Sequence, residues 1–167
     1  MRIRVITTGG TIDKVYFDAK STYQVGEPLA GEVLREAGVA FEYEVEPVMR
    51  KDSLEITPED RVRIREAVER CPEGRVVVTH GTDTMAETGR ALAGIPGKTV
   101  VLTGAIQPGR FRSTDAPFNL GFAVAAVQIL PAGVYLAMNG RVFDPFRARK
   151  NLRTNRFEAM EPRPDSG

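Results

Sequence analysis

The chain has 167 residues and carries 23 basic and 22 acidic side chains, which gives a net charge of +1. Its 42% hydrophobic and 27% charged residues are typical of a globular domain, so composition excludes an intrinsically disordered chain. The balanced charge supplies no field that would recruit nucleic acid or an anionic membrane, and we expect neither partner. A single Cys and a single His exclude an internal disulfide and argue against a His/Cys zinc site, so we expect no metal.

The N-terminus runs from Arg2 and Arg4 directly into Thr-Thr-Gly-Gly, without the long apolar stretch of a signal peptide. The longest apolar run, over 118–130, is interrupted by Gln128 and is too short to span a bilayer. We therefore expect a cytoplasmic protein.

The sequence of the first half of the chain predicts alternating strands and helices. Residues 3–7 are β-rich and stop at two glycines, which predicts a strand and then a loop. Residues 12–27 mix aromatic and charged side chains, which favours a hairpin or lid. A short helix is predicted over 28–37, a strand over 41–49, and a helix from Thr57 (N-cap) and Pro58 to Cys71.

The second half continues the alternation. Continuous β-branched runs over 75–79 and 99–103 predict strands that are buried on both faces. Helices are predicted over 83–92 and 119–130, and a strand over 133–138 that pairs with 141–143 through an Asn-Gly turn. This order predicts a three-layer α/β fold, flavodoxin/Rossmann-like, with a mostly parallel sheet flanked by helices.

Ligands of such sheets bind at the carboxyl ends of the strands, so the loops after Thr7, Thr79 and Thr103 are the candidate sites. The first loop, Thr-Thr-Gly-Gly-Thr-Ile-Asp over 7–13, is neither a dinucleotide fingerprint nor a P-loop, and we expect no cofactor. Two interpretations stay open for it: a tight turn, or a catalytic hydroxyl on Thr11 presented by flexible glycines.

The second loop, Thr-His-Gly-Thr-Asp-Thr-Met over 79–85, joins a buried strand to a helix. A helix N-terminus offers free N–H groups to an anion or oxyanion. Asp83, Thr82 or Thr84 could alternatively cap that helix. His80 is either a packed histidine or a general base.

Together the two loops resemble the two signature motifs of the bacterial-type L-asparaginases, threonine amidohydrolases that deamidate asparagine and often glutamine. Thr-Gly-Gly-Thr-Ile follows the first strand, and Val-Thr-His-Gly-Thr-Asp-Thr-Met follows a later one. The resemblance continues through 102–105, 115–120 and 133–139. It implies that residues 1–160 form a catalytic domain like the family's N-terminal domain. It also implies a short-chain form in which 161–167 is a polar, Pro-rich tail and the family's C-terminal domain is absent.

The resemblance also implies roles for individual residues. Thr11 matches the primary nucleophile, and Tyr23 matches the lid tyrosine that hydrogen-bonds it. Lys150 matches the catalytic lysine, which deprotonates the second threonine, Thr82, while Asp83 bridges the two.

Substrate contacts follow from the same match. Ser53 would hold the α-carboxylate, although the family more often shows Asp-Ser-x-Asp-Met where this chain has Asp-Ser-Leu-Glu-Ile. Thr82 and Asp83 would meet the substrate, with Asp83 on its α-amino group, and backbone N–H groups of Gly10 and Gly81 would face the oxyanion. The residues leave simpler interpretations open: Tyr23 as an aromatic cover of the core, Ser53 as a turn residue, and the basic run 141–156 as a solvated face or an anion patch.

The expected activity is hydrolysis of L-asparagine to L-aspartate and ammonia through an acyl-threonine on Thr11, with glutaminase activity left open as a secondary one. In the family, the C-terminal domain of a neighbouring subunit supplies an acid to the lid tyrosine. Here Glu27, Glu55 or an acid of another subunit are the alternatives, and we expect a homo-oligomer, a dimer or tetramer. Two other functions stay open: a catalytically weak amino-acid-binding or regulatory module, and an ammonia-releasing amidotransferase subunit.

Overall fold

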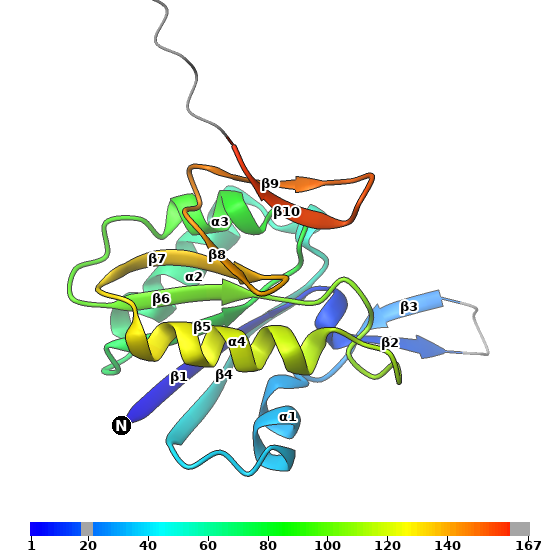
Figure 1. Ribbon diagram of the computed structural model, residues 1–167, viewed down its shortest axis with the longest axis horizontal. Helices are drawn as coiled ribbons and strands as arrows, with labels where there is room; N and C mark the ends of the chain where they lie inside the picture. The colour runs from blue at the N-terminus through cyan, green and yellow to red at the C-terminus, as the bar shows by residue number, and fades with distance from the viewer. Residues whose placement is uncertain (18–21, 161–167) are drawn as a thin grey trace, which may run out of the picture.

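The computed structural model describes residues 1–17 and 22–160, and its central feature is a six-stranded sheet with helices on both faces (Figure 1). The strands lie in the order β4-β1-β5-β6-β7-β8, and only the last pair is antiparallel. Their bounds are β1 Arg2–Gly9, β4 Glu42–Lys51, β5 Arg75–Thr79, β6 Thr99–Thr103, β7 Gly133–Met138 and β8 Arg141–Phe143. Counted along the chain, the parallel strands run 2-1-3-4-5, the flavodoxin-like order, so the predicted fold class is confirmed.

The helices form the two outer layers. Helices α2 (Pro58–Arg70) and α3 (Met85–Ala91) cover one face, while α1 (Ala30–Glu36) and α4 (Ala116–Ile129) cover the other (Figure 1). Successive side chains of a strand point to opposite faces, so Val76 and Val78 pack toward α2 and α3 while Val77 packs toward α4. This explains why the β5 and β6 sequences are apolar along their lengths rather than at alternate positions.

Helix boundaries follow local sequence signals. The predicted start of α2 is confirmed by a capping box: the Thr57 hydroxyl accepts from the Asp60 N–H (3.2 Å) and the Asp60 carboxylate accepts from the Thr57 N–H (3.0 Å). Helix α4 begins three residues earlier than predicted, because Pro117 is well suited to a first helical turn.

Two hairpins stand outside the main sheet. Strands β2 (Lys14–Phe17) and β3 (Thr22–Val25) form the predicted lid hairpin, whose residues 18–21 lie outside the described part of the chain. Strands β9 (Ala148–Asn151) and β10 (Arg156–Ala159) form a second hairpin that the sequence did not predict. Its strands are short and polar, and it forms because Ala148 and Phe157 are buried in the core beside Phe143.

The predicted tail over 161–167 also lies outside the described residues. Among the helices of the described part, none is long and apolar enough to cross a membrane.

Candidate active site

The loops that follow β1 and β5 touch each other at the carboxyl edge of the sheet. After β1 the backbone passes through Gly10 at φ +86° into a short 3₁₀ helix, η1 (Thr11–Asp13). A Cβ on Gly10 would collide with the backbone of Gly81, so only glycine allows this approach. The contact places Thr11 and Thr82 each one residue from the junction. It lies between the first and third parallel strands, the switch point where flavodoxin-like sheets bind ligands.

The loop after β4 is the third wall of this region. It forms a 3₁₀ helix, η3 (Ser53–Glu55), in which Ser53 is 2% exposed. A Cβ on Gly81 would lie 2.5 Å from the Ser53 Cβ, and the Thr84 hydroxyl donates to the Ser53 carbonyl at 2.7 Å. Ser53 is thus both a turn residue and a neighbour of the loop that carries Thr82 and Asp83.

The second hairpin brings Lys150 to this region. The Lys150 Nζ donates to the Thr82 hydroxyl at 2.8 Å and pairs with Asp83 Oδ1 at 2.7 Å. Thr84, one of the three capping alternatives, is the N-cap residue of helix α3, but this N-cap makes no side-chain cap bond. A threonine hydroxyl in contact with a lysine, itself held by a carboxylate, is an arrangement in which the lysine can exchange a proton with the hydroxyl.

The structure shows that His80 is a packed histidine. Its side chain is fully buried, with Nδ1 2.7 Å from the Gly81 carbonyl and Nε2 2.8 Å from the Thr88 hydroxyl. Burial lowers the pKa of His80 to about 4, although the Gly81 carbonyl opposes that shift. The neutral ring donates from Nδ1 and accepts at Nε2, so it holds the 80–81 loop in place and is not a general base.

The lid tyrosine packs against two aromatic rings, at tilts of 51° and 53°, rather than bonding to the first threonine. Tyr23 is 49% exposed and lies between Tyr16 (ring centroids 5.3 Å apart) and Phe111 (6.1 Å). Among the hydrogen bonds of the described residues, none links the Tyr23 hydroxyl to Thr11. The Tyr23–Thr11 hydrogen bond therefore stays a prediction.

Glu27 and Glu55, the two acids of this chain predicted as alternative partners of Tyr23, both make other contacts. Glu27 pairs with Arg50 at 2.7 Å, and the Glu55 carboxylate accepts from the Asp52 N–H at 3.1 Å within the capping box of η3. Neither contact involves Tyr23, so the acid partner of this tyrosine stays a prediction.

A hollow of about 520 Å³ opens beside Lys150 and Asp83. Its lining combines these charged groups with two exposed leucines and the start of α3: Leu54, Asp83, Ala86, Glu87, Arg90, Ala148, Arg149, Lys150 and Leu152. Over the residues that the structure describes, no group of three His, Cys, Asp or Glu side chains could hold a metal ion.

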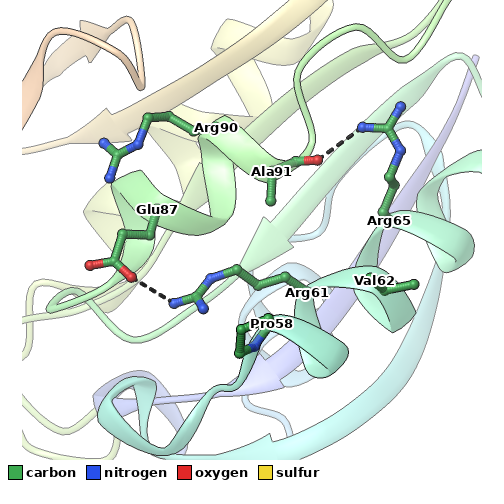
Figure 2. A pocket seen from close by; sticks show the side chains of 7 residues that line it. All are labelled: Pro58, Arg61, Val62, Arg65, Glu87, Arg90 and Ala91. Atoms are coloured by element: carbon green, nitrogen blue, oxygen red, sulfur yellow. Dashed lines mark hydrogen bonds and ion pairs between the residues drawn. The ribbon is translucent and has the colours of Figure 1, made fainter.

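A second pocket, of about 370 Å³, lies between α2 and α3 (Figure 2). The Arg61–Glu87 ion pair (2.9 Å) and a hydrogen bond from Arg65 to the Ala91 carbonyl (2.9 Å) span it. Its lining carries no hydroxyl or lysine, and it lies along the helices rather than at the strand ends. We therefore place the candidate site at the three loops.

One ion pair at this site was not predicted from the sequence. Lys14, the first residue of β2, pairs with Asp52 at 2.7 Å, directly before Ser53. The spacing Asp52-x-x-Glu55 is a capping-box signal that could have placed Asp52 at the start of a helical turn. No local signal joins it to Lys14, because the two residues meet only through the tertiary fold.

Comparison with known proteins identifies the family of the chain. A family model described as "Asparaginase, N-terminal" matches residues 2–165. The chain belongs to the asparaginase family. It is 34% identical over 174 residues to the L-asparaginase of Thermococcus kodakarensis, a match that covers 96% of this chain and 51% of that protein.

Two further matches extend the comparison. The solved structure of the thermostable L-asparaginase from Thermococcus kodakarensis superposes with a TM-score of 0.83 and 32% identity, covering 95% of this chain and 51% of that one. A subunit of the glutamyl-tRNA(Gln) amidotransferase of Thermoplasma acidophilum is 31% identical over 180 residues, covering 96% of this chain and 42% of that protein. The chain thus spans about half the length of the relatives it matches.

Proposed function

We propose that this domain hydrolyses the side-chain amide of L-asparagine to L-aspartate and ammonia. The observation that carries the proposal is the contact of Lys150 with both Thr82 and Asp83, beside the loop that presents Thr11. Membership of the asparaginase family supports the same chemistry. A simple binding module would need neither two hydroxyl groups nor a lysine at this position.

The reaction proceeds in two steps because an amide is a poor electrophile and ammonia a poor leaving group. In the first, the Thr11 oxygen bonds to the amide carbon, the C–N bond breaks, and the hydroxyl proton leaves with the ammonia by way of Tyr23. In the second, water attacks the acyl carbon, the ester C–O bond breaks, and the proton that the water gives up is returned to the Thr11 oxygen, which restores its hydroxyl. Lys150 takes a proton from Thr82, so that this hydroxyl can in turn accept one from the attacking water.

The substrate carries an ammonium and a carboxylate, so its pocket needs groups of both signs. Asp83 would meet the α-amino group. Ser53 and nearby backbone N–H groups would meet the α-carboxylate, while the N–H groups of Gly10 and Gly81 would face the oxyanion. One well-placed donor to an oxyanion contributes about 3–4 kcal/mol to transition-state stabilisation.

A second candidate substrate is glutamine, because a relative described as a glutaminase-asparaginase, from Acinetobacter glutaminasificans, is 28% identical over 173 residues, covering 92% of this chain and 51% of that protein. Asparagine and glutamine differ by one methylene, which a pocket discriminates by only about 1–3 kcal/mol. We further propose cytoplasmic residence, a catalytic domain over 1–160 that uses no metal or cofactor, and a homo-oligomeric assembly.

A coupled ammonia assay with L-asparagine, L-glutamine and D-asparagine tests the proposal. We expect release from L-asparagine, and we expect Thr11→Ala to lower kcat by several orders of magnitude because it removes the attacking oxygen. Thr154→Ala, at an exposed threonine in the turn of the second hairpin, is the matched control and should retain wild-type activity. No ammonia from any of the three substrates would refute the hydrolase function and favour a binding module.

A further inference from the structure

Two lysine–aspartate pairs lie on neighbouring loops of the candidate site. Lys14 Nζ is 2.7 Å from Asp52 Oδ2, and Lys150 Nζ is 2.7 Å from Asp83 Oδ1. Three of the four side chains are partly buried and Asp83 is exposed, with exposed fractions between 14% and 37%. Such pairs are screened by solvent less than pairs on an open surface.

The two pairs are close because their loops pack together. Asp52 directly precedes Ser53, and Ser53 packs against Gly81, two residues before Asp83. Desolvation raises the pKa of Asp52, but hydrogen bonds from Lys14 and the Leu54 N–H, together with the charges of Lys14 and Lys150, hold it below its usual value. Electrostatic interaction is mutual, so the charge on Asp52 also acts on Lys150.

This mutual action matters for a lysine that has to work as a base. A carboxylate nearby favours the ammonium form of a lysine and so opposes its deprotonation. Asp83 already stabilises that form directly. A second negative charge at Asp52, if it were not neutralised, would hold the proton on Lys150 still more firmly.

We propose that Lys14 is a positioning residue for the reaction: its ammonium group holds and neutralises the Asp52 carboxylate, and thereby sets the pH at which Lys150 gives up its proton. The inference rests on the proposed function, in which Lys150 is the base. The Lys14–Asp52 ion pair also joins the base of the lid hairpin, where Lys14 lies, to the loop that carries Ser53.

The other charged groups around Lys150 have partners of their own. Glu87 pairs with Arg61 at 2.9 Å, Arg149 with Glu158 at 3.4 Å, and Arg90 donates to the Pro145 carbonyl at 3.0 Å. These groups line the same hollow and stay constant in the variants below. The Lys14–Asp52 pair therefore carries the charges near Lys150 that the variants change.

Opposite charge changes at this pair should move the titration of Lys150 in opposite directions. Lys14→Met leaves Asp52 without its cation, so the acidic limb of the kcat/KM profile should move to higher pH. Asp52→Asn leaves Lys14 unneutralised, so the limb should move to lower pH, while Asn keeps the capping function at η3. We expect each shift to be on the order of half a pH unit, and the double variant to return near wild type.

NMR of isotope-labelled lysine, which follows the titration of Lys150 without substrate, provides a readout independent of activity. Lys51→Met is the matched control, because it removes a similar lysine–aspartate pair, Lys51–Asp60 (2.6 Å), from the residue before Asp52. It should leave the Lys150 titration unchanged. Equal or same-direction shifts in Lys14→Met and Asp52→Asn, by NMR, would overturn the inference. Opposite NMR shifts in a protein that releases no ammonia would uphold the electrostatic coupling of the Lys14–Asp52 pair to Lys150 and refute the proposed reaction.

Discussion

At the residue scale, the site depends on a lysine that local sequence could not place. Thr82 and Asp83 stand in a strong motif, whereas Lys150 follows a run rich in arginine, where several cations could have taken its role. Only the family resemblance selected it. The structure brings its Nζ to both Thr82 and Asp83, because the second hairpin folds back over α3 (Figure 1).

Lys150→Met should leave the protein folded and nearly inactive. The methionine keeps most of the side-chain volume but cannot accept a proton, and general base catalysis typically contributes about 10²–10⁴-fold to the rate. Steady-state kinetics with circular dichroism as the folding check would measure this. Arg153→Met, at an exposed cation in the turn of the same hairpin, is the control and should keep normal activity. If Lys150→Met kept most of its activity, another group would have to be the base.

At the element scale, the sequence predicted those elements that carry a local signal, such as a run of apolar residues or a helix cap. Strands β5 and β6 are built on runs of adjacent apolar residues, and α2 has a complete capping box. The second hairpin escaped prediction because Ala-Arg-Lys-Asn and Arg-Phe-Glu-Ala contain no β-branched residues and no clear alternation. Its register is fixed by burial of Phe157 beside Phe143, a tertiary contact that no local pattern contains.

The lid hairpin is fastened at its base by Asp13. The Asp13 carboxylate accepts from the Leu29 N–H at 2.8 Å, and its carbonyl accepts from the Gly26 N–H at 2.7 Å. Burial raises the pKa of Asp13 to about 7, although the Leu29 N–H and the charges of Arg110 and Arg50 oppose the shift. The folded protein thus takes up this proton at a higher pH than the unfolded chain does. The contribution of Asp13 to the free energy of unfolding therefore falls as pH rises from about 4 to 7.

The titration of His80 changes the free energy of unfolding with pH in the opposite direction. Its pKa is lowered to about 4, so its contribution to stability is lost as pH falls from about 6.5 to 4. In wild type the two contributions largely cancel over this window. Asp13→Asn removes one of them, so this variant should be more stable than wild type by on the order of 3 kcal/mol at pH 8 and similar to it near pH 4.

Denaturant unfolding between pH 4 and 8 would measure this difference. Asp144→Asn is the control, since Asp144 is an exposed carboxylate that also accepts a backbone N–H, from Phe146 at 2.9 Å. It should show no comparable pH-dependent gain. A stability difference for Asp13→Asn that is constant across this pH range would contradict the assigned titration.

At the scale of the whole molecule, the outer face of α4 presents exposed apolar side chains that the candidate site does not use. Phe118 and Ile129 are 63% and 81% exposed, and Phe118 stacks on Phe122 with ring centroids 6.4 Å apart. Residues 118, 122, 125 and 129 are spaced by four, three and four, as in a stripe that packs against another helix. The helix carries no charged side chain over its whole length. An apolar stripe of this kind is typical of a protein interface.

We therefore predict that the protein assembles into a dimer or tetramer with α4 at a contact between copies. Phe118→Glu combined with Ile129→Lys should lower the molar mass in solution, because both substitutions place charges in an apolar contact and the desolvation cost favours separate chains. Light scattering after size-exclusion chromatography would measure the mass. Val62→Lys, at a half-exposed valine on α2, is the control and should keep the wild-type mass. A monomeric wild type at working concentration would refute the assembly. An unchanged mass in the double variant would show that the copies meet at another face.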